Sequence, residues 1–350
     1  MSNAEVVAVG LCTPVGTSTH MTLASLRSGL VRFAETEVLD AVAEPVRASR
    51  LSLLDVSCSR TQRMVALARQ ALVEVESLLA SFRRGRVPVY LGLPEGGLGA
   101  AVEQDSLVSA LESGAGGGRL HVTKVHASGR AAFFEALASA WQDLRAGREG
   151  SVALVGAVDS LVDGASLEAL VAARMNLGRR NPDGRIPGEA AGFVVLARPG
   201  VSKALKRESE GVVLGTALAT EPKPFVGQGP CLAEGLTDVL YTLRRDAVAG
   251  TRRVDTVLAC QPGDSFWSTE FSRAYLRNTA LMPEPLRVHV VGEGLGDAGA
   301  GAGPVMLGVA LHRARWLRSG ALRSLVYGSA DGGRVGACVV ERTRSATEEP

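Results

Sequence analysis

Three side chains in the sequence carry groups that could act as a nucleophile or a base. Cys260 and Ser128 are potential nucleophiles, and His126 is a potential base close to Ser128. A thiol attacks a thioester as its thiolate, and a serine needs a base and an oxyanion hole. No oxyanion-hole pattern is visible beside Ser128, so we favour a helix N-cap turn there, with Arg130 at the helix start. Cys260 is likewise interpreted as a buried apolar residue, with nucleophilic chemistry as the alternative.

Metal chemistry is not indicated by the remaining cysteines and histidines. No C-x-x-C pair is present, and His121 and His126 lack the i, i+4 spacing of a helical metal-ligand pair. We therefore predict no metal site and no cofactor. The odd number of scattered cysteines predicts a reduced, cytoplasmic protein. The cysteines are Cys12, Cys58, Cys231, Cys260 and Cys338, and the other histidines, interpreted as structural or surface residues, are His20, His289 and His312.

The composition is that of a globular chain with a large core. Of 350 residues, 46% are hydrophobic, and 38 basic residues against 36 acidic ones leave a net charge of +2. We expect no nucleic-acid partner, because such a partner requires a basic surface. Apolar stretches such as 151–158 and 190–197 are strand-sized and far below the roughly 20 residues of a membrane span. The first residues lack the features of a signal peptide, which again predicts a cytoplasmic protein.

Short β-branched segments alternate with longer segments of helical period, and this pattern predicts an α/β fold with strands buried between helices. The predicted strands are Glu5–Leu11, Val87–Leu93, Val152–Val158, Gly192–Ala197, Gly211–Ala219, Val254–Leu258, Leu286–Val291, Ser324–Tyr327 and Val335–Glu341. The predicted helices are Thr61–Phe82, Arg130–Ala146, Cys231–Ala249, Ser268–Thr279 and Gly303–Arg318.

The two parts of the chain end in similar segments. Residues 187–196 (PGEAAGFVVL) echo residues 331–340 (DGGRVGACVV). Such an echo predicts two related halves rather than two unrelated domains. We place these halves at residues 1–200 and 201–342, and we expect residues 343–350 to form a flexible polar tail.

Several motifs together resemble a β-ketoacyl synthase (3-oxoacyl-ACP synthase) of the thiolase superfamily over nearly the whole chain. Residues 6–16 and Leu26-Arg27-Ser28-Gly29 are similar to the first strand, the G-x-x-x-P-x-G turn and the L-x-x-G helix end of that family. Residues 152–160 are similar to the strand after the nucleophile helix. Residues 181–192 (NPDGRIPGEAAG) resemble the D-x-x-G-x-x-x-G-E-G-A-G segment. The resemblance implies a thiolase-like five-layer αβαβα fold built from two duplicated halves, and a dimer formed through edge strands.

The same resemblance implies a catalytic Cys and two His residues, and this sequence departs from all three. Arg130 stands at the position of the nucleophilic Cys, Cys260 marks the segment of the first His, and Asp297 stands at the position of the second His. A carboxylate at Asp297 would repel the oxyanion that the family His stabilises. We therefore expect no catalytic residue here, and we keep Ser128, His126 and Cys260 as fallback candidates for a rearranged site.

The loop that gates the acyl tunnel in the family is also changed. Asp331, Gly332 and Gly333 stand at the equivalent of this gate, and Asp331 replaces its Phe. An acidic side chain that prefers water would oppose the entry of an apolar acyl chain. The acyl tunnel is therefore not expected.

These departures predict a catalytically inactive β-ketoacyl synthase-like protein that is a partner subunit or an adaptor. The resemblance offers two precedents. One is the chain-length factors of polyketide synthases, which would relate this chain to polyketide or fatty acid synthesis. The other is the thiolase-like proteins associated with type VI secretion effectors. A chain-length factor should keep an apolar tunnel, whereas an adaptor should bind its effector without an acyl ligand. The alternative is an acyltransferase of the β-ketoacyl synthase type with a rearranged site, acting on acyl-carrier or CoA thioesters.

The expected partners follow from the same resemblance. We predict a homodimer or a heterodimer with a related thiolase-fold subunit, because exposed edge strands are commonly covered by pairing. An acyl carrier protein or a secreted effector is a possible further partner. We predict neither nucleic-acid binding nor membrane insertion.

Overall fold

The computed structural model describes residues 3–82, 85–114, 118–148, 150–227, 229–247, 252–313 and 320–344. Its main feature is a ten-stranded mixed sheet with the strand order β10-β9-β11-β12-β8-β1-β7-β6-β4-β5. The two five-stranded parts of this sheet meet where β1 pairs with β8 in antiparallel fashion. The sequence-predicted α/β class is therefore confirmed.

The N-terminal part of the sheet contains β1 (Ala4–Cys12), β4 (Val87–Leu93), β5 (Leu120–Ala127), β6 (Val152–Ser160) and β7 (Glu189–Ala197). The helices of this part are α1 (Thr19–Arg27), α2 (Arg60–Ser81), α3 (Gln104–Gly114), α4 (Ala132–Ala146), α5 (Gly164–Ala172) and α6 (Val201–Ala204). A short 3₁₀ turn, η1 (Gly129–Ala131), precedes α4. A separate hairpin is formed by β2 (Phe33–Leu39) and β3 (Pro45–Ser49).

The C-terminal part contains β8 (Gly211–Thr220), β9 (Thr256–Cys260), β10 (Val288–Val290), β11 (Gly320–Ser329) and β12 (Arg334–Arg344). Its helices are α7 (Glu234–Asp246), α8 (Ser265–Arg277), α9 (Gly292–Leu295) and α10 (Ala302–Arg313). The 3₁₀ turns η2 (Phe225–Gly227) and η3 (Gly299–Gly301) complete it. The strand order of this part repeats that of the N-terminal part, as the duplicated fold requires.

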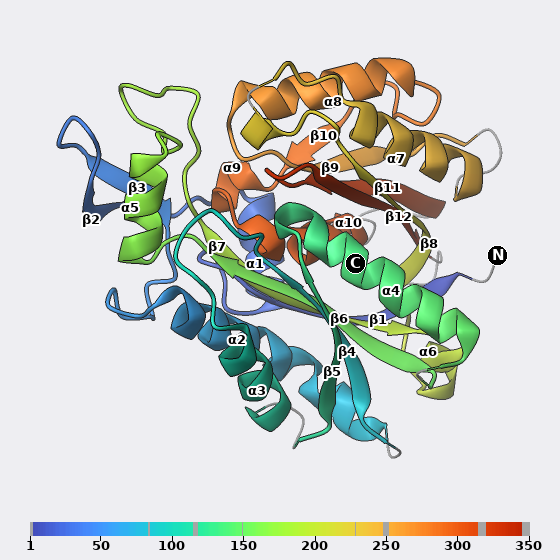
Figure 1. Cartoon of the computed structure of the whole chain (residues 1–350). Helices are drawn as coiled ribbons and strands as arrows, with labels where there is room; N and C mark the ends of the chain where they lie inside the picture. The colour runs from blue at the N-terminus through green and yellow to red at the C-terminus, as the bar shows by residue number, and fades with distance from the viewer. Residues whose placement is uncertain are drawn as a thin grey trace.

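The elements form five layers, αβαβα. Figure 1 shows α2 and α3 below the N-terminal strands, α4 and α10 between the two parts of the sheet, and α7 and α8 above the C-terminal strands. α4 contacts β4 and β6 on one side and β8 and β12 on the other, which places it in the central layer. The thiolase-like five-layer fold predicted from the sequence is confirmed.

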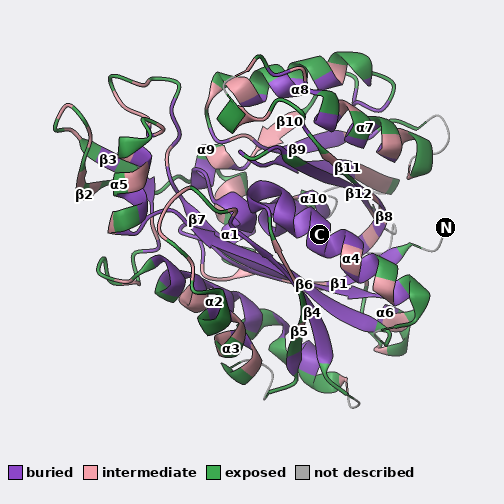
Figure 2. Ribbon diagram, in the orientation of Figure 1, coloured by how far each residue is buried: buried purple, intermediate pink, exposed green. Residues whose placement is uncertain are grey.

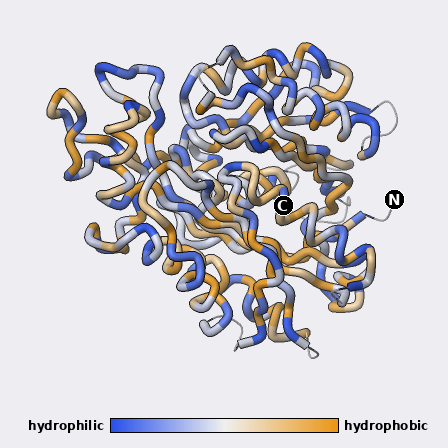
Figure 3. The backbone as a smooth tube through the Cα atoms, in the orientation of Figure 1, coloured by the Kyte–Doolittle hydropathy of each residue, from blue (hydrophilic) through white to orange (hydrophobic). Residues whose placement is uncertain are grey.

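Burial explains why these sequences form these layers. The strands β4, β6 and β7 are buried along their whole length, because helices cover both of their faces (Figure 2). The outer helices have one buried face each, and hydrophilic and hydrophobic stretches alternate along them (Figure 3). The central layer is the main apolar core, and it includes Phe133, Phe134 and Leu137 of α4 with Val305 and Leu307 of α10.

Some predicted boundaries differ from the structure for local reasons. The helix predicted from Arg130 begins at Ala132, because residues 129–131 form the 3₁₀ turn η1. The helix predicted from Cys231 begins at Glu234, since Ala233 has a left-handed backbone with φ of 56°. The hairpin β2–β3 was not predicted, because both strands lack a continuous apolar run and β2 has no buried residue.

The division at residue 200 stays a prediction, and most of the predicted tail at 343–350 lies outside the described residues. In the described part of the chain, every helix is too short or too polar to cross a membrane.

Close packing in the central layer yields the first prediction. A Cβ atom at Gly301 would lie 2.1 Å from the carbonyl oxygen of Ala190 in β7. Gly301→Ala should therefore lower the free energy of unfolding by about 2–3 kcal/mol, because the backbone must move. Urea unfolding followed by circular dichroism measures this change.

The matched control is Gly164→Ala in α5, where an added Cβ atom would meet no heavy atom within 4 Å. This variant should unfold at the same urea concentration as the wild type or at a higher one. Equal destabilisation by both substitutions would contradict the crowding argument.

Candidate functional site

Five charged side chains from distant segments meet at the carboxyl ends of the central strands. Arg130 lies in η1 after β5, and Arg185 lies in the loop before β7. Asp297 precedes η3, Asp331 lies in the turn between β11 and β12, and Asp264 precedes α8. We call these five residues the Arg–Asp cluster. It joins Arg130, Asp297 and Asp331, which sequence analysis had singled out separately.

The contacts within the Arg–Asp cluster are direct and numerous. Arg130 donates to both carboxylate oxygens of Asp297 at 3.2 and 3.1 Å, and to Oδ1 of Asp331 at 2.9 Å. Arg185 donates through Nη1 to Asp297 at 3.1 Å and to Asp331 at 3.0 Å. Nη2 of Arg185 also donates to Asp264 at 3.0 Å. Asp297 and Asp331 therefore each bridge the two guanidinium groups.

The cluster is buried, and its charges stabilise one another. Arg130 is 3% exposed and Arg185 is fully buried. Burial opposes the charge of Arg130, but Asp297 and Asp331 outweigh it and raise the pKa of the guanidinium. Burial likewise opposes ionisation of Asp297, yet Arg130 and Arg185 hold its pKa below the usual value. Arg130 and Asp297 are therefore both charged at neutral pH.

Aromatic rings cover the guanidinium groups. The Cζ atom of Arg130 lies 4.8 Å from the ring centre of Trp267, and that of Arg185 lies 5.3 Å from the ring centre of Phe225. These two rings stack at 5.5 Å. Cations over aromatic faces are attracted by the ring quadrupole, and the rings also exclude water. The Arg–Asp cluster is thus enclosed on this side by an apolar surface.

The loop equivalent to the family gate is tied down from the opposite half of the molecule. Glu95 accepts hydrogen bonds from the backbone N–H groups of Asp331 and Gly332, both at 2.8 Å. Gly333 has φ of 93°, and Glu221 donates its backbone N–H to the Gly333 carbonyl at 2.7 Å. The expectation that Asp331 seeks water is wrong: its side chain is buried, because both arginines neutralise it.

Almost no empty space remains beside the cluster. The cavity lined by Arg130, Arg185, Asp297 and Asp331 has a volume of about 20 Å³. A cavity of this size holds about one water molecule. An acyl chain cannot enter it without displacing paired charges.

Cys260 lies at the end of β9, next to the cluster, as a buried thiol. Burial raises its pKa to about 12, although Arg130 acts in the opposite direction. The thiolate that acyl transfer requires is therefore very rare at neutral pH. This environment suits the interpretation of Cys260 as a packing residue.

Ser128 and His126 both turn toward Glu135 of α4 and not toward each other. Ser128 Oγ donates to Glu135 at 2.6 Å, and His126 Nδ1 lies 3.4 Å from the same carboxylate oxygen. The other ring nitrogen of His126 contacts Ser139 Oγ at 3.1 Å. Ser128 does occupy an N-cap position, but its side chain makes no capping hydrogen bond. With Glu135 between them, His126 is not placed to take a proton from Ser128.

The sequence did not identify Arg185, Asp264 or Glu95 as site residues. Arg185 lies inside the segment 181–192, and Asp264 follows Cys260 by four residues. One feature of the sequence could have identified them: each is a charged residue within or next to a Gly- and Pro-containing loop beside a buried strand. Such loops approach the core, so their charges need partners there.

Two further buried ion pairs hold the loops of the N-terminal half. Arg60 pairs with Asp159 at 2.8 Å, and Arg63 pairs with Glu189 at 2.8 Å. Asp159 also accepts the backbone N–H of Ala300 at 3.1 Å and so links this region to η3. Glu189 belongs to the quoted G-E-A-A-G motif. Across the described ranges, no group of three or more His, Cys, Asp or Glu side chains is arranged to hold a metal ion.

No protein-family model and no curated protein matches the sequence, whereas many solved structures match the fold. A type II PKS acyl-carrier protein in complex with its ketosynthase bound to the hexaketide (AntDE:AntF) matches with a TM-score of 0.78 and 13% identity, covering 98% of this chain and 100% of that chain. The chain has the ketosynthase fold.

Two further ketosynthase structures match over a similar extent. The ishigamide ketosynthase/chain length factor has a TM-score of 0.78 and 16% identity, covering 98% of this chain and 100% of that chain. The oxazolomycin ketosynthase domain OzmH KS7 of Streptomyces albus JA3453 has a TM-score of 0.76 and 17% identity, covering 99% of this chain and 77% of that chain. The resemblance to the thiolase superfamily that the sequence motifs indicated is confirmed as a likeness of fold.

Removing one guanidinium from the cluster should be costly. Arg185→Met keeps an unbranched side chain but leaves Asp297 and Asp331 with Arg130 alone and Asp264 without its arginine partner. We expect the free energy of unfolding to fall by about 3–5 kcal/mol, because buried carboxylates lose their partner. Urea unfolding at pH 7 tests this.

The control is Arg179→Met in the same loop, where Arg179 pairs with Glu44 and both side chains are exposed, by 80% and 44%. This change should alter the stability by less than about 0.5 kcal/mol. If Arg185→Met were equally mild, the cluster would not be the stabilising centre described above.

Glu270 in α8 provides a pH-dependent test of the same buried region. The residue is 1% exposed, and burial raises the pKa of its carboxyl to about 7, although the charge of Arg130 opposes this shift. Because the pKa is raised in the folded state, the stabilising protonated form is fully present below the unfolded pKa near 4.5 and is lost as pH rises through 7.

Glu270→Gln should therefore remove a stability loss of up to roughly 3 kcal/mol that the wild type shows between pH 5 and pH 8. Urea unfolding of both proteins at several pH values measures the difference. Curves that stay parallel across this range would show that Glu270 does not titrate there.

Proposed function

We propose that this chain is a ketosynthase-fold protein that does not condense acyl groups and works through its surface, as the partner subunit or adaptor of another protein. The observation that carries this proposal is the buried Arg–Asp cluster. It occupies the positions that the sequence resemblance assigns to the nucleophilic Cys and the second His.

The chemistry of the cluster opposes condensation. Arg130 carries no nucleophilic atom, and its guanidinium is already paired with Asp297 and Asp331. A developing oxyanion would have to compete with two fixed carboxylates for these donors, so it would be destabilised. The cavity of about 20 Å³ leaves no room for the acyl chain.

The closed centre favours an adaptor role over that of a chain-length factor. A chain-length factor should keep an apolar tunnel, whereas the corresponding region here is filled by paired charges and covered by Trp267 and Phe225. An adaptor needs only the outer surface of the fold. Association with a type VI secretion effector therefore remains part of the proposal, and co-expression with the products of neighbouring genes tests it directly.

A rearranged acyltransferase is the second candidate, and the site residues argue against it. Cys260 is a buried thiol, and Ser128 shares Glu135 with His126 instead of facing it. The carboxylate of Glu135 has a pKa of about 2, because hydrogen bonds from its neighbours outweigh the effect of burial. It accepts protons weakly and is a poor general base.

The partner surface that we propose includes the edge strand β5. Among the described strands, β5 pairs only with β4, and most of its residues are partly or fully exposed. Unpaired edge strands favour pairing with another chain. The matched ketosynthase structures include a ketosynthase/chain length factor and a complex with an acyl-carrier protein, which supports a thiolase-fold subunit or a carrier protein as the partner. A cytoplasmic location is also proposed, in keeping with the five free cysteines.

Intact-mass analysis after incubation with acyl and malonyl thioesters tests the absence of chemistry. We expect no covalent adduct on the wild type, on Cys260→Ala or on Ser128→Ala, because no activated nucleophile is present. An adduct on the wild type that disappears in one variant would name a nucleophile and overturn the proposal.

Iodoacetamide labelling provides an internal control for thiol access in the same sample. Cys58 is only partly buried, whereas Cys260 is buried, so labelling should reach Cys58 first. Faster labelling of Cys260 would mean that the site opens in solution.

Light scattering after gel filtration tests the use of β5. We expect a dimer at micromolar concentration and a shift toward monomer for Thr123→Pro. Thr123 is exposed and is skipped in the β4–β5 register, so a proline there removes a backbone N–H from the edge strand at a position that is not paired with β4. A monodisperse wild-type monomer would contradict the proposed self-association and direct the search to a related subunit.

A further inference from the structure

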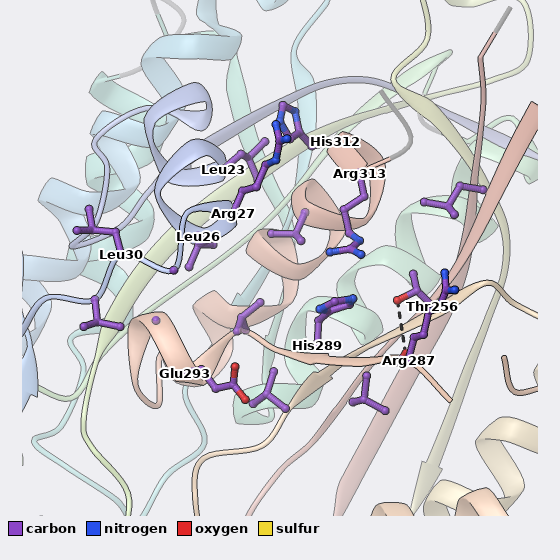
Figure 4. Close-up of a pocket in the computed structure, with 18 of the residues that line it drawn as sticks. Leu23, Leu26, Arg27, Leu30, Thr256, Arg287, His289, Glu293, His312 and Arg313 are labelled. Atoms are coloured by element: carbon purple, nitrogen blue, oxygen red, sulfur yellow. Dashed lines mark hydrogen bonds between the residues drawn. The ribbon is translucent and has the colours of Figure 1, made fainter. Parts of the chain in front are cut away.

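A second cavity lies at the other end of the C-terminal strands, away from the Arg–Asp cluster. Its volume is about 600 Å³, and it is bounded by α1, α9, α10 and β10 (Figure 4). Thr256, the first residue of β9, lines this cavity, whereas Cys260, the last residue of β9, lies beside the cluster. We call this cavity the lower pocket. Its volume lies in the range of small-molecule sites.

One side of the lower pocket is apolar. Leu23 and Leu26 of α1 and Leu30 after it lie together on this side in Figure 4. Val290 of β10 and Val309 of α10 also line the pocket. Leu30 is 41% exposed, and it adds exposed apolar surface to that of its neighbours, as in a ligand-binding groove. An apolar group of a ligand would remove this surface from water.

The opposite side carries positive charge without matching acids. Within the described ranges, neither Arg287 nor Arg313 forms an ion pair, although both line the pocket. Burial lowers the pKa of the Arg313 guanidinium, and repulsion by Arg287 lowers it further. Two cations held close together without a carboxylate are stabilised when an anion binds between them.

The acidic residues that line the lower pocket do not neutralise these arginines. Asp255 lies 3.3 Å from Arg252 and accepts the backbone N–H of Arg323 at 2.7 Å. Figure 4 shows Glu293 at the end of the pocket away from Arg313. Arg27 and His312 lie at a third corner and add further basic groups to the lining.

His289 lies between the apolar and the basic sides, with its ring in the middle of the pocket (Figure 4). Its Nε2 atom is buried and has no hydrogen-bond partner in the described part of the chain. A buried polar atom of this kind normally binds a partner. Burial, together with Arg313 and Arg287, lowers the pKa of His289, so the neutral ring can donate one N–H to a ligand.

We propose that the lower pocket binds an amphipathic organic anion. A carboxylate or phosphate group would lie against Arg287, Arg313 and His289, and an apolar body would pack against the leucines of α1. This inference is independent of the proposed function, because the lower pocket shares no residue with the Arg–Asp cluster.

Isothermal titration with four probes tests the proposal on the full chain. Decanoate and decyl phosphate should bind, whereas decanol and inorganic phosphate should bind at least tenfold more weakly, since each of these lacks one half of the required chemistry. Decanoate and decyl phosphate together distinguish a carboxylate from a phosphate head group. Equal binding of decanol and decanoate, or of inorganic phosphate and decyl phosphate, would overturn the proposal.

Variants then locate the site. The double substitution Arg287→Gln and Arg313→Gln should weaken decanoate binding at least tenfold, whereas Arg47→Gln, an exposed arginine of β3 outside the pocket, should leave it unchanged. Binding should also raise the pKa of His289, measured by NMR, because an anion offsets the two arginines. Unchanged affinity in the double variant, or an unmoved His289 titration, would place any bound anion elsewhere.

Discussion

The structure depends on one constraint: two guanidinium groups and two carboxylates are buried together, with the partly exposed Asp264 at their edge, and none of the four buried groups can remain charged alone. In a medium of low polarity an unpaired ion is costly, so each member of the Arg–Asp cluster requires the others. Because Arg130, Arg185, Asp264, Asp297 and Asp331 come from five separate segments, pairing their charges also fixes the positions of these segments. The cluster therefore connects the two halves of the fold, and Glu95, which follows β4, adds a further link by accepting the backbone N–H of Asp331.

The same constraint decides the chemistry at the centre of the molecule. A catalytic site needs groups whose hydrogen bonds become strongest in the transition state, and such groups must be available when the charge develops. The donors of Arg130 and Arg185 are already used by fixed carboxylates, and the rings of Trp267 and Phe225 close the space above them. The proposed loss of the reaction is compatible with the retained fold, since the layers are formed by buried strands and helices.

The fold could be predicted from the sequence because its causes are local and repetitive. Uninterrupted apolar runs such as Val152–Val158 indicate buried strands, and the order of the glycine motifs fixes which loops meet. The assembly of the site could be predicted only in part. Asp297 and Asp331 were interpreted as unfavourable isolated charges, because their common partner Arg185 lies more than a hundred residues away and its charge was not recognised as part of the site. Ser128 was interpreted as a side-chain cap, yet a carboxylate on the next helix, Glu135, competes successfully for its hydroxyl.

The position of Arg130 explains why the sequence departs from the synthase pattern at positions 130, 297 and 331 together. Arg130 lies in the turn that leads into α4, and a helix N-terminus favours negative groups and disfavours cations. A guanidinium at this point, buried and next to the positive end of a helix, can be accommodated only if carboxylates lie directly against it. Asp297 and Asp331 meet that need, and they in turn exceed what one arginine can neutralise, so Arg185 is required as well. Replacing Arg130 by an uncharged side chain would leave two buried carboxylates, Asp297 and Asp331, with Arg185 alone, so a change at position 130 requires changes at its partners as well.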